Sequence, residues 1–113
     1  MKTKAPREVI IYGNDFYDFY ERQAQKVREK IDWTIGLVRD LERVPEKYLK
    51  HIEGTRDLYE IRVGFGNNIY RVFCFFDEGR LIVLLNGFQK KSQKTPKNEI
   101  EKALKLQKQY RHE

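Results

Sequence analysis

Apolar residues in the first third of the chain pass from one short run into a helical repeat. Val9–Tyr12 predicts a first strand, and the Gly-Asn-Asp sequence at residues 13–15 interrupts it and offers a helix N-cap. From there to about Arg43, apolar side chains recur three and four positions apart, so we expect one bent helix or two helices packed as a hairpin. Pro45 ends this pattern, and residues 46–51 are expected to add a short helical turn.

The second half of the chain has the periodicity of strands. Leu58–Val63 alternates between two faces, and Ile69–Phe76 is apolar on both faces apart from one arginine. Leu81–Leu85 is a continuous apolar run, as expected of a strand that is buried on both sides. Residues 64–68 and 77–79 are rich in glycine, asparagine and acidic residues, which predicts tight turns and therefore a three-stranded antiparallel meander.

A last helix is expected near the C-terminus. Thr95 and Pro96 offer an N-cap and a proline at the first helical position, and Ile100 and Leu104 supply a narrow apolar stripe. The order of strand, helices, meander and helix predicts an α+β fold in one domain over residues 1–113. We expect the helices to cover one side of a mostly antiparallel sheet and to leave the other side as the working surface.

The positive charge of the chain is concentrated near its C-terminus. The formal net charge is +6, and the segment from Asn86 to the end holds eight basic residues against three acidic ones. Such a segment favours nucleic acid or an anionic membrane surface as partner, although a solvated lysine-rich helix has the same composition. No apolar run approaches the roughly 20 residues of a membrane span, and Cys74, the single cysteine, is expected to be a buried thiol. We therefore expect a cytoplasmic protein with no membrane partner.

Common catalytic and cofactor motifs are missing from the sequence. There is no glycine-rich phosphate or dinucleotide loop and no HExxH pair, and His51 and His112 are far apart. We therefore expect neither a metal nor a cofactor. What remains is a set of cations on or directly after the predicted strands, namely Arg62, Arg71, Lys90 and Lys91.

These cations are suited to a phosphodiester. Several cations on one face can clamp a phosphate and stabilise a phosphorane transition state, while RNA supplies its own nucleophile in the 2′-hydroxyl. Arg71 is the only charge in its predicted strand, so it needs a partner. That partner is either a phosphate in a solvated cleft or the carboxylate of Glu60 or Asp57. Arg62, which shares a predicted face with Glu60, and the two lysines have the alternative of a solvated surface.

The strand motifs resemble a known superfamily of toxins. The segments LYEIR at 58–62, YR at 70–71 and GFQKKSQKTP at 87–96, in this order, look like the phage-derived, HigB-like branch of the RelE/ParE toxins. The resemblance covers roughly residues 52–103. It implies the RelE-like microbial ribonuclease fold and the toxin of a type II toxin–antitoxin system. Such a toxin is an endoribonuclease that cleaves messenger RNA on the ribosome by 2′-hydroxyl attack, without a metal.

The resemblance also implies residue roles and partners. On its pattern Arg71 binds the scissile phosphate, and Arg62, Lys90 and Lys91 are further catalytic cations. The other residues expected to contact RNA are Lys50, His51, Lys94 and Lys97. The implied partners are messenger RNA, the ribosome and a cognate antitoxin of the helix-turn-helix type. Two alternatives stay open: a ParE-like toxin that poisons DNA gyrase, and a module that binds RNA without cutting it.

Overall fold

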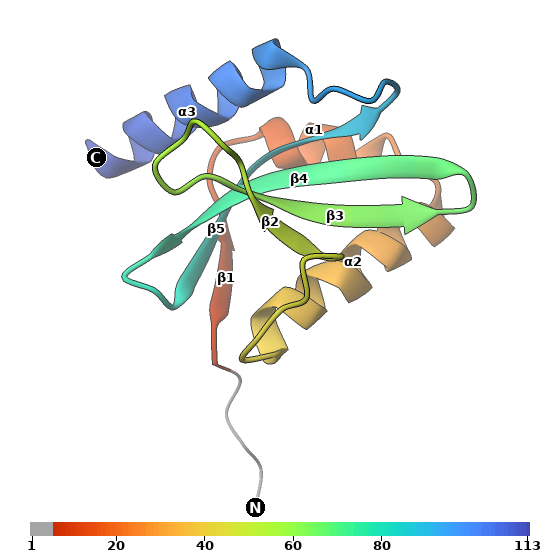
Figure 1. The fold of residues 1–113 in the computed structure, drawn as a ribbon, viewed down its shortest axis with the longest axis horizontal. Helices are drawn as coiled ribbons and strands as arrows, with labels where there is room; N and C mark the ends of the chain where they lie inside the picture. The colour runs from red at the N-terminus through yellow and green to blue at the C-terminus, as the bar shows by residue number, and fades with distance from the viewer. Residues whose placement is uncertain (1–5) are drawn as a thin grey trace, which may run out of the picture.

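The helices and strands follow one another along the chain in nearly the order that the periodicity predicts. The computed structural model describes residues 6–113, so residues 1–5 of the expected single domain lie outside the described part (Figure 1). In chain order the elements are β1 (Glu8–Ile11), α1 (Asp15–Glu21), α2 (Gln25–Asp40), β2 (Leu49–His51), β3 (Tyr59–Phe65), β4 (Asn68–Asp77), β5 (Leu81–Lys90) and α3 (Lys97–Arg111). The long helical repeat is therefore two helices.

The strands form one sheet in the order β1-β5-β4-β3-β2. Neighbouring strands are antiparallel except for β1, which runs parallel to β5. β3, β4 and β5 are consecutive in the chain and adjacent in the sheet, so they form the predicted meander. The α+β fold with a mostly antiparallel sheet is thereby confirmed.

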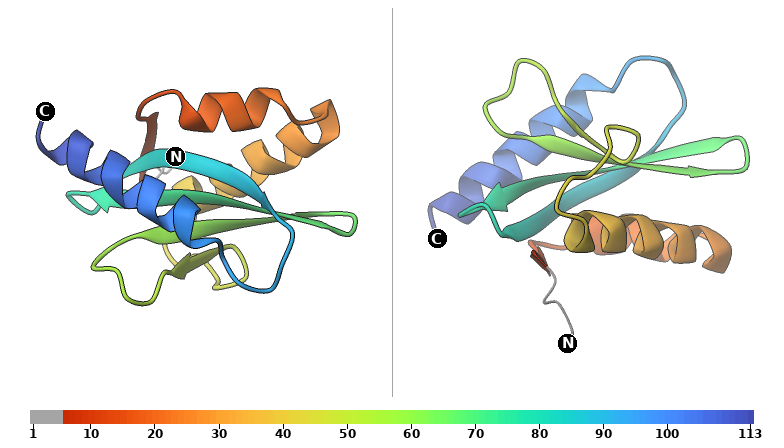
Figure 2. Two further views of the ribbon diagram at one scale, coloured as in Figure 1. Left: turned by 90° about the horizontal axis from the view of Figure 1, so that it is seen from above. Right: turned by 60° about the horizontal axis from the view of Figure 1, so that its bottom comes forward.

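Helices cover both faces of the sheet, so the expectation of one open face is wrong. α1 and α2 lie on one face and α3 on the other (Figure 2). The reason lies in β4, whose apolar side chains alternate between two cores: Val72 and Cys74 face α1 and α2, while Phe73 and Phe75 face α3. An open face would leave the two phenylalanines in water, and α3 removes that apolar surface from solvent.

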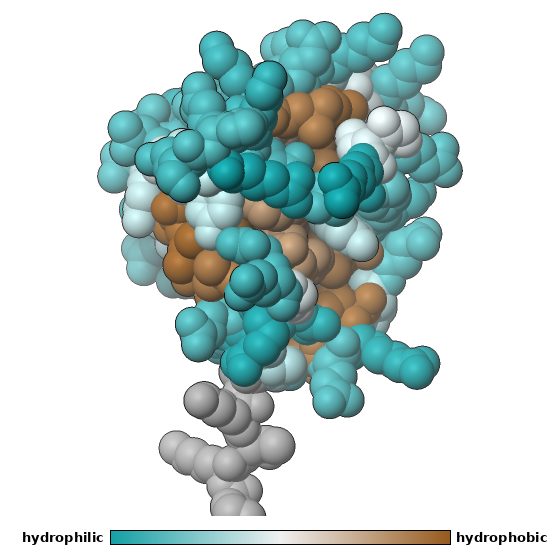
Figure 3. Space-filling view, turned by 90° about the vertical axis from the view of Figure 1, so that its left-hand side faces the viewer, coloured by the Kyte–Doolittle hydropathy of each residue, from teal (hydrophilic) through white to brown (hydrophobic). Residues whose placement is uncertain are grey.

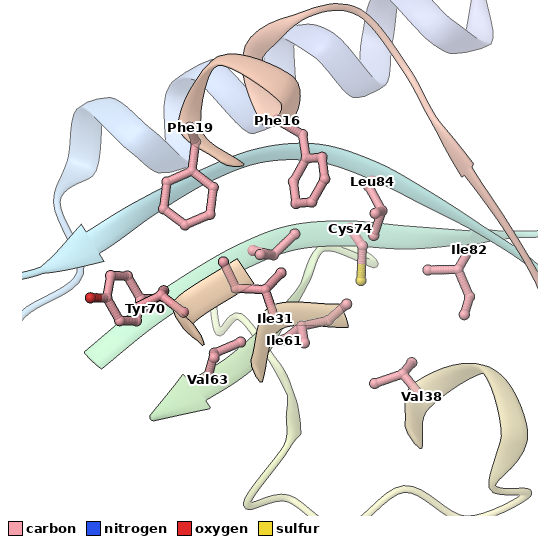
Figure 4. Close-up of a cluster of buried hydrophobic side chains, with 12 residues drawn as sticks. Phe16, Phe19, Ile31, Val38, Ile61, Val63, Tyr70, Cys74, Ile82 and Leu84 are labelled. Carbon is pink, nitrogen blue, oxygen red and sulfur yellow. The ribbon is translucent and has the colours of Figure 1, made fainter. Parts of the chain in front are cut away.

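The core beneath α1 and α2 is shown in Figure 4. Phe16 and Phe19 come from α1, Ile31 comes from α2, and all three pack against apolar side chains of the sheet. Cys74 is fully buried in this core, as expected, and burial raises the pKa of its thiol. Cys74 is therefore a packing residue and not a nucleophile. On the side of the molecule drawn in Figure 3, hydrophilic side chains surround smaller apolar areas.

Several element boundaries differ from the prediction by a few residues, and Pro96, not Thr95, is the N-cap of α3. Two of the differences arise because long-range pairing decides the boundary. The backbone N–H groups of Tyr48 and Leu49 donate to the carbonyl of Pro45, which closes one turn, and β2 then pairs with β3 instead of continuing as helix. β5 continues to Lys90, beyond the apolar run, because its second half pairs with the start of β4. As a result, Asn86, Gln89 and Lys90 lie within the sheet.

Candidate functional site

Arg62 and Arg71 lie directly opposite each other on β3 and β4. Glu60 is two residues before Arg62 on the same strand face, so all three side chains meet on the side of the sheet that carries α3. Arg62 Nε donates to Glu60 Oε2 at 2.9 Å, and Arg71 Nε lies 3.4 Å from the same oxygen. One carboxylate oxygen therefore holds both guanidinium groups in place.

The cluster of Arg62, Arg71 and Glu60 carries an excess of positive charge in a shielded position. The side chains of Glu60 and Arg71 are 5% and 9% exposed, and that of Arg62 is 28% exposed. Burial lowers the pKa of Arg71, with Glu60 opposing and Arg62 adding to the shift, yet a guanidinium stays charged in proteins. Two positive charges against one negative charge leave room for an anionic partner.

The two partners expected for Arg71 were a phosphate in a solvated cleft and the carboxylate of Glu60 or Asp57. Arg71 pairs with Glu60, whereas Asp57 accepts hydrogen bonds from Gln107 and Arg111 of α3 instead. The expected solvated cleft is only partly present, because Arg71 is buried to 8% exposure. Its Nη1 donates to the carbonyl of Tyr70 at 3.1 Å, and its buried Nε has no partner with hydrogen-bond geometry among the described residues. The guanidinium retains capacity for another acceptor.

Arg62 and Arg71 line a hollow of about 440 Å³, which we call the basic hollow. Its wall brings together α2, the turn before β2 and the hairpin of β3 and β4. The lining residues are Lys30, Thr34, Lys47, Tyr48, Arg62, Val63, Gly64, Ile69 and Arg71. Four of them are cations, and within residues 6–113 neither Lys30 nor Lys47 forms an ion pair.

Lys30 and Lys47 did not emerge from the sequence. Lys30 belongs to an amphipathic helix and Lys47 to a turn, and in the sequence both segments look like ordinary solvent-exposed segments. The available signal was the helical spacing of Lys30 and Thr34, which places both on one side of α2. Only the packing of α2 against β3 shows that this side of the helix lines the same hollow as Arg62 and Arg71.

The two predicted lysines, Lys90 at the end of β5 and Lys91 directly after it, lie next to the basic hollow. Lys90 pairs with Ile69 across β5 and β4, and Ile69 lines both the basic hollow and a second hollow formed with Lys90 and Lys91. Lys90 is half-buried and Lys91 is exposed. The two hollows therefore share Ile69 as a lining residue.

The other predicted RNA contacts are distributed over both faces. Lys50 pairs with Glu60, which places it on the face of the arginines. His51 pairs with Tyr59 on the opposite face, where the two ring centroids lie 5.3 Å apart. Lys94 and Lys97 are exposed, and neither lines the basic hollow.

The arrangement is suited to binding a phosphodiester. Guanidinium groups donate in a planar fork that matches two phosphate oxygens, and lysines add point charges around it. Within residues 6–113 there is no group of three or more His, Cys, Asp or Glu side chains that could hold a metal ion. None of the helices described here is long and apolar enough to cross a membrane.

A comparison with protein families gives one match. The model of the family described as "Phage derived protein Gp49-like" matches residues 18–108. This range begins within α1, ends within α3 and includes every residue of the basic hollow. No curated protein matches the sequence significantly.

Proposed function

The chain belongs to the family of phage-derived Gp49-like proteins, and from this premise we propose that it is the toxin of a type II toxin–antitoxin system. We further propose that it belongs to the HigB-like branch of the RelE/ParE superfamily, because its strand motifs resemble that branch. The proposed activity is metal-independent endonucleolytic cleavage of messenger RNA on the ribosome.

One observation carries the proposal: the excess positive charge of Arg62, Arg71 and Glu60 opens into the basic hollow beside Lys30 and Lys47. A phosphate of RNA would balance that charge. The fork of Arg71 would bind its non-bridging oxygens, and Arg62 would add a second guanidinium from the neighbouring strand. Both arginines arise from paired strands and are held by Glu60, so they would need little rearrangement when a phosphate arrives.

The proposed chemistry needs no other nucleophile than the RNA itself. The 2′-hydroxyl loses its proton to a base and its oxygen attacks the adjacent phosphorus. The bond to the 5′-oxygen breaks and that oxygen takes up a proton, so that one product ends in a 2′,3′-cyclic phosphate and the other begins with a 5′-hydroxyl. The arginines stabilise the extra negative charge of the phosphorane more strongly than that of the ground state. This mechanism predicts no dependence on a bound metal.

Expression in a bacterial host tests the proposal. We expect growth arrest with shortened messages, and an Arg71→Ala variant should abolish both effects. Arg39→Ala is the matched control, because Arg39 is half-exposed, pairs with the adjacent Asp40 and does not line the basic hollow. DNA damage without message shortening would indicate a gyrase-directed toxin instead, and ribosome binding without cleavage would indicate an RNA-binding module.

We further propose a cognate antitoxin of the helix-turn-helix type, encoded by a neighbouring gene. A segment with acidic side chains would complement the basic hollow, since opposite potentials speed association and exclude the substrate. Co-expression of that gene should restore growth. A chain that is harmless when expressed alone at a high level would contradict the toxin assignment.

A further inference from the structure

Trp33, Tyr48, Lys30 and Lys47 form a cluster at the rim of the basic hollow, which we call the Trp33 cluster. The rings of Trp33 and Tyr48 meet edge to face with centroids 5.8 Å apart. Lys30 Nζ lies 4.5 Å from the centroid of Trp33, and Lys47 Nζ lies 5.5 Å from the centroid of Tyr48. Tyr48 and both lysines line the hollow that contains Arg62 and Arg71.

The exposure of Trp33 is unexplained by packing. It is 49% exposed, more than any other large apolar side chain in the described part of the chain. Trp33 lies three residues after Lys30 on α2 and does not itself line the hollow, but its ring contacts Lys30 and Tyr48, which do. An exposed indole beside a bound phosphate is well placed to stack on a base.

We propose that the Trp33 cluster is a stacking subsite for one base of single-stranded RNA. This inference rests on the proposed function, because it assumes that the phosphate next to that base is bound at Arg62 and Arg71. The indole provides the aromatic surface, Tyr48 packs against it in an edge-to-face contact, and the two lysines bind neighbouring phosphates. The subsite selects single-stranded RNA, since a base inside a duplex is already stacked on both sides.

The side chains around Trp33 favour a nucleic acid over a protein partner. Lysine is depleted in protein–protein interfaces, yet here a lysine contacts each of the two aromatic rings. An aromatic ring between cations is the combination by which proteins bind single strands, because every base offers a π face and every nucleotide a negative charge.

Intrinsic fluorescence provides a direct test, because Trp33 is the only tryptophan of the chain. The probe is a hexamer of deoxyadenosine, which lacks the 2′-hydroxyl and is therefore not cleaved. The matched ligand is an abasic hexamer with the same phosphates and no bases. We expect the deoxyadenosine hexamer to change the emission of Trp33. At low salt it should bind on the order of ten-fold more tightly than the abasic hexamer, because one base–aromatic stack contributes that much affinity.

Variants test whether Trp33 is responsible for the difference in affinity between the two hexamers. Trp33→Ala should lower the affinity for the deoxyadenosine hexamer by about ten-fold and leave that for the abasic hexamer unchanged, while Trp33→Phe should retain part of the difference. The fold should persist, because Trp33 is half-exposed and alanine is a better helix former than tryptophan. Tyr17→Ala is the control, an aromatic 46% exposed on α1 that does not line the basic hollow.

Unchanged emission on adding the deoxyadenosine hexamer would overturn the subsite, as would equal affinity of wild type and Trp33→Ala; Trp33 would then be left for contact with a protein. If either of these results were obtained and the wild type still cleaved messenger RNA, the subsite would be wrong and the proposed function would be unaffected. If the hexamer changed the emission of Trp33 but the protein cleaved no messenger RNA, the ribonuclease activity would be wrong and the subsite would be supported.

Discussion

Arg71 Nε lies 3.4 Å from the oxygen of Glu60 that also accepts a hydrogen bond from Arg62. The side chain of Glu60 is only 5% exposed, and it has two functions. It compensates buried positive charge, and it fixes the spacing of two guanidinium groups. Because one carboxylate cannot neutralise two arginines, the fold itself leaves a positive charge at the basic hollow. The proposed phosphate binding uses that remaining charge.

Glu60→Gln should destabilise the protein. The substitution leaves two guanidinium groups directly opposite each other without a carboxylate, and we expect the free energy of unfolding to fall by about 3 kcal/mol, at the lower end of the range for a buried pair that loses one partner. Denaturant unfolding measures this. Glu101→Gln, an exposed residue of α3, is the control and should change little. Equal stability of the two variants would show that Glu60 does not hold the arginines.

Gly87→Ala tests the close contact between α1 and β5. A Cβ atom at Gly87 would clash with the ring of Phe19, a residue that is 1% exposed. We expect a loss of about 1–3 kcal/mol, as for overpacking of a core. Gly64→Ala is the matched control in a strand, because a Cβ there meets nothing within 4 Å. A Gly87→Ala variant as stable as wild type would contradict this packing.

Asp57 should make the docking of α3 dependent on pH. Burial opposes its ionisation, but hydrogen bonds from Arg111 and Gln107 prevail and lower the pKa of Asp57. A lowered pKa in the folded state contributes stability that is present above the unfolded value near 3.9 and is lost as the pH falls through the folded value.

Thermal unfolding of wild type and Asp57→Asn between pH 7 and pH 2 measures this contribution. The difference in melting temperature should be largest near pH 7 and shrink as the pH falls below roughly 4. Glu53→Gln, an exposed carboxylate in the same loop, should follow wild type throughout. A constant difference between wild type and Asp57→Asn would show that the pairing with α3 contributes nothing.

Local periodicity was enough to predict most of the fold. The three-residue and four-residue spacing gave α1 and α2, and the alternation at Leu58–Val63 correctly placed Ile61 and Val63 on the face opposite Glu60 and Arg62. β2 was missed because its three residues are strand only through pairing with β3, whose partner residues lie 8 to 12 positions further along the chain. The second covered face was missed although β4 is apolar on both sides, which already required it.

The site was predicted from the sequence in part. Arg62 and Arg71 were found because a charge in an apolar strand demands a partner, and the structure brings them together. Lys30 and Lys47 were missed, since nothing local distinguishes a lysine beside a hollow from one in open solvent. Both Lys50 and His51 are predicted from the sequence to contact RNA. Adjacent strand residues point to opposite faces of the sheet, however, and only Lys50 shares the face of the arginines.

The decisive measurement is cleavage of ribosome-bound messenger RNA by purified wild type and Arg71→Ala. We expect fragments ending in a 2′,3′-cyclic phosphate or its 3′-phosphate, and a rate lower by on the order of 10²–10³ in Arg71→Ala, with partial recovery in Arg71→Lys. Melting curves recorded in parallel should show both variants folded, because Arg62 still pairs with Glu60. A wild type that leaves the message intact, a 3′-hydroxyl product, or wild-type cleavage per folded molecule of Arg71→Ala would contradict the proposed ribonuclease mechanism.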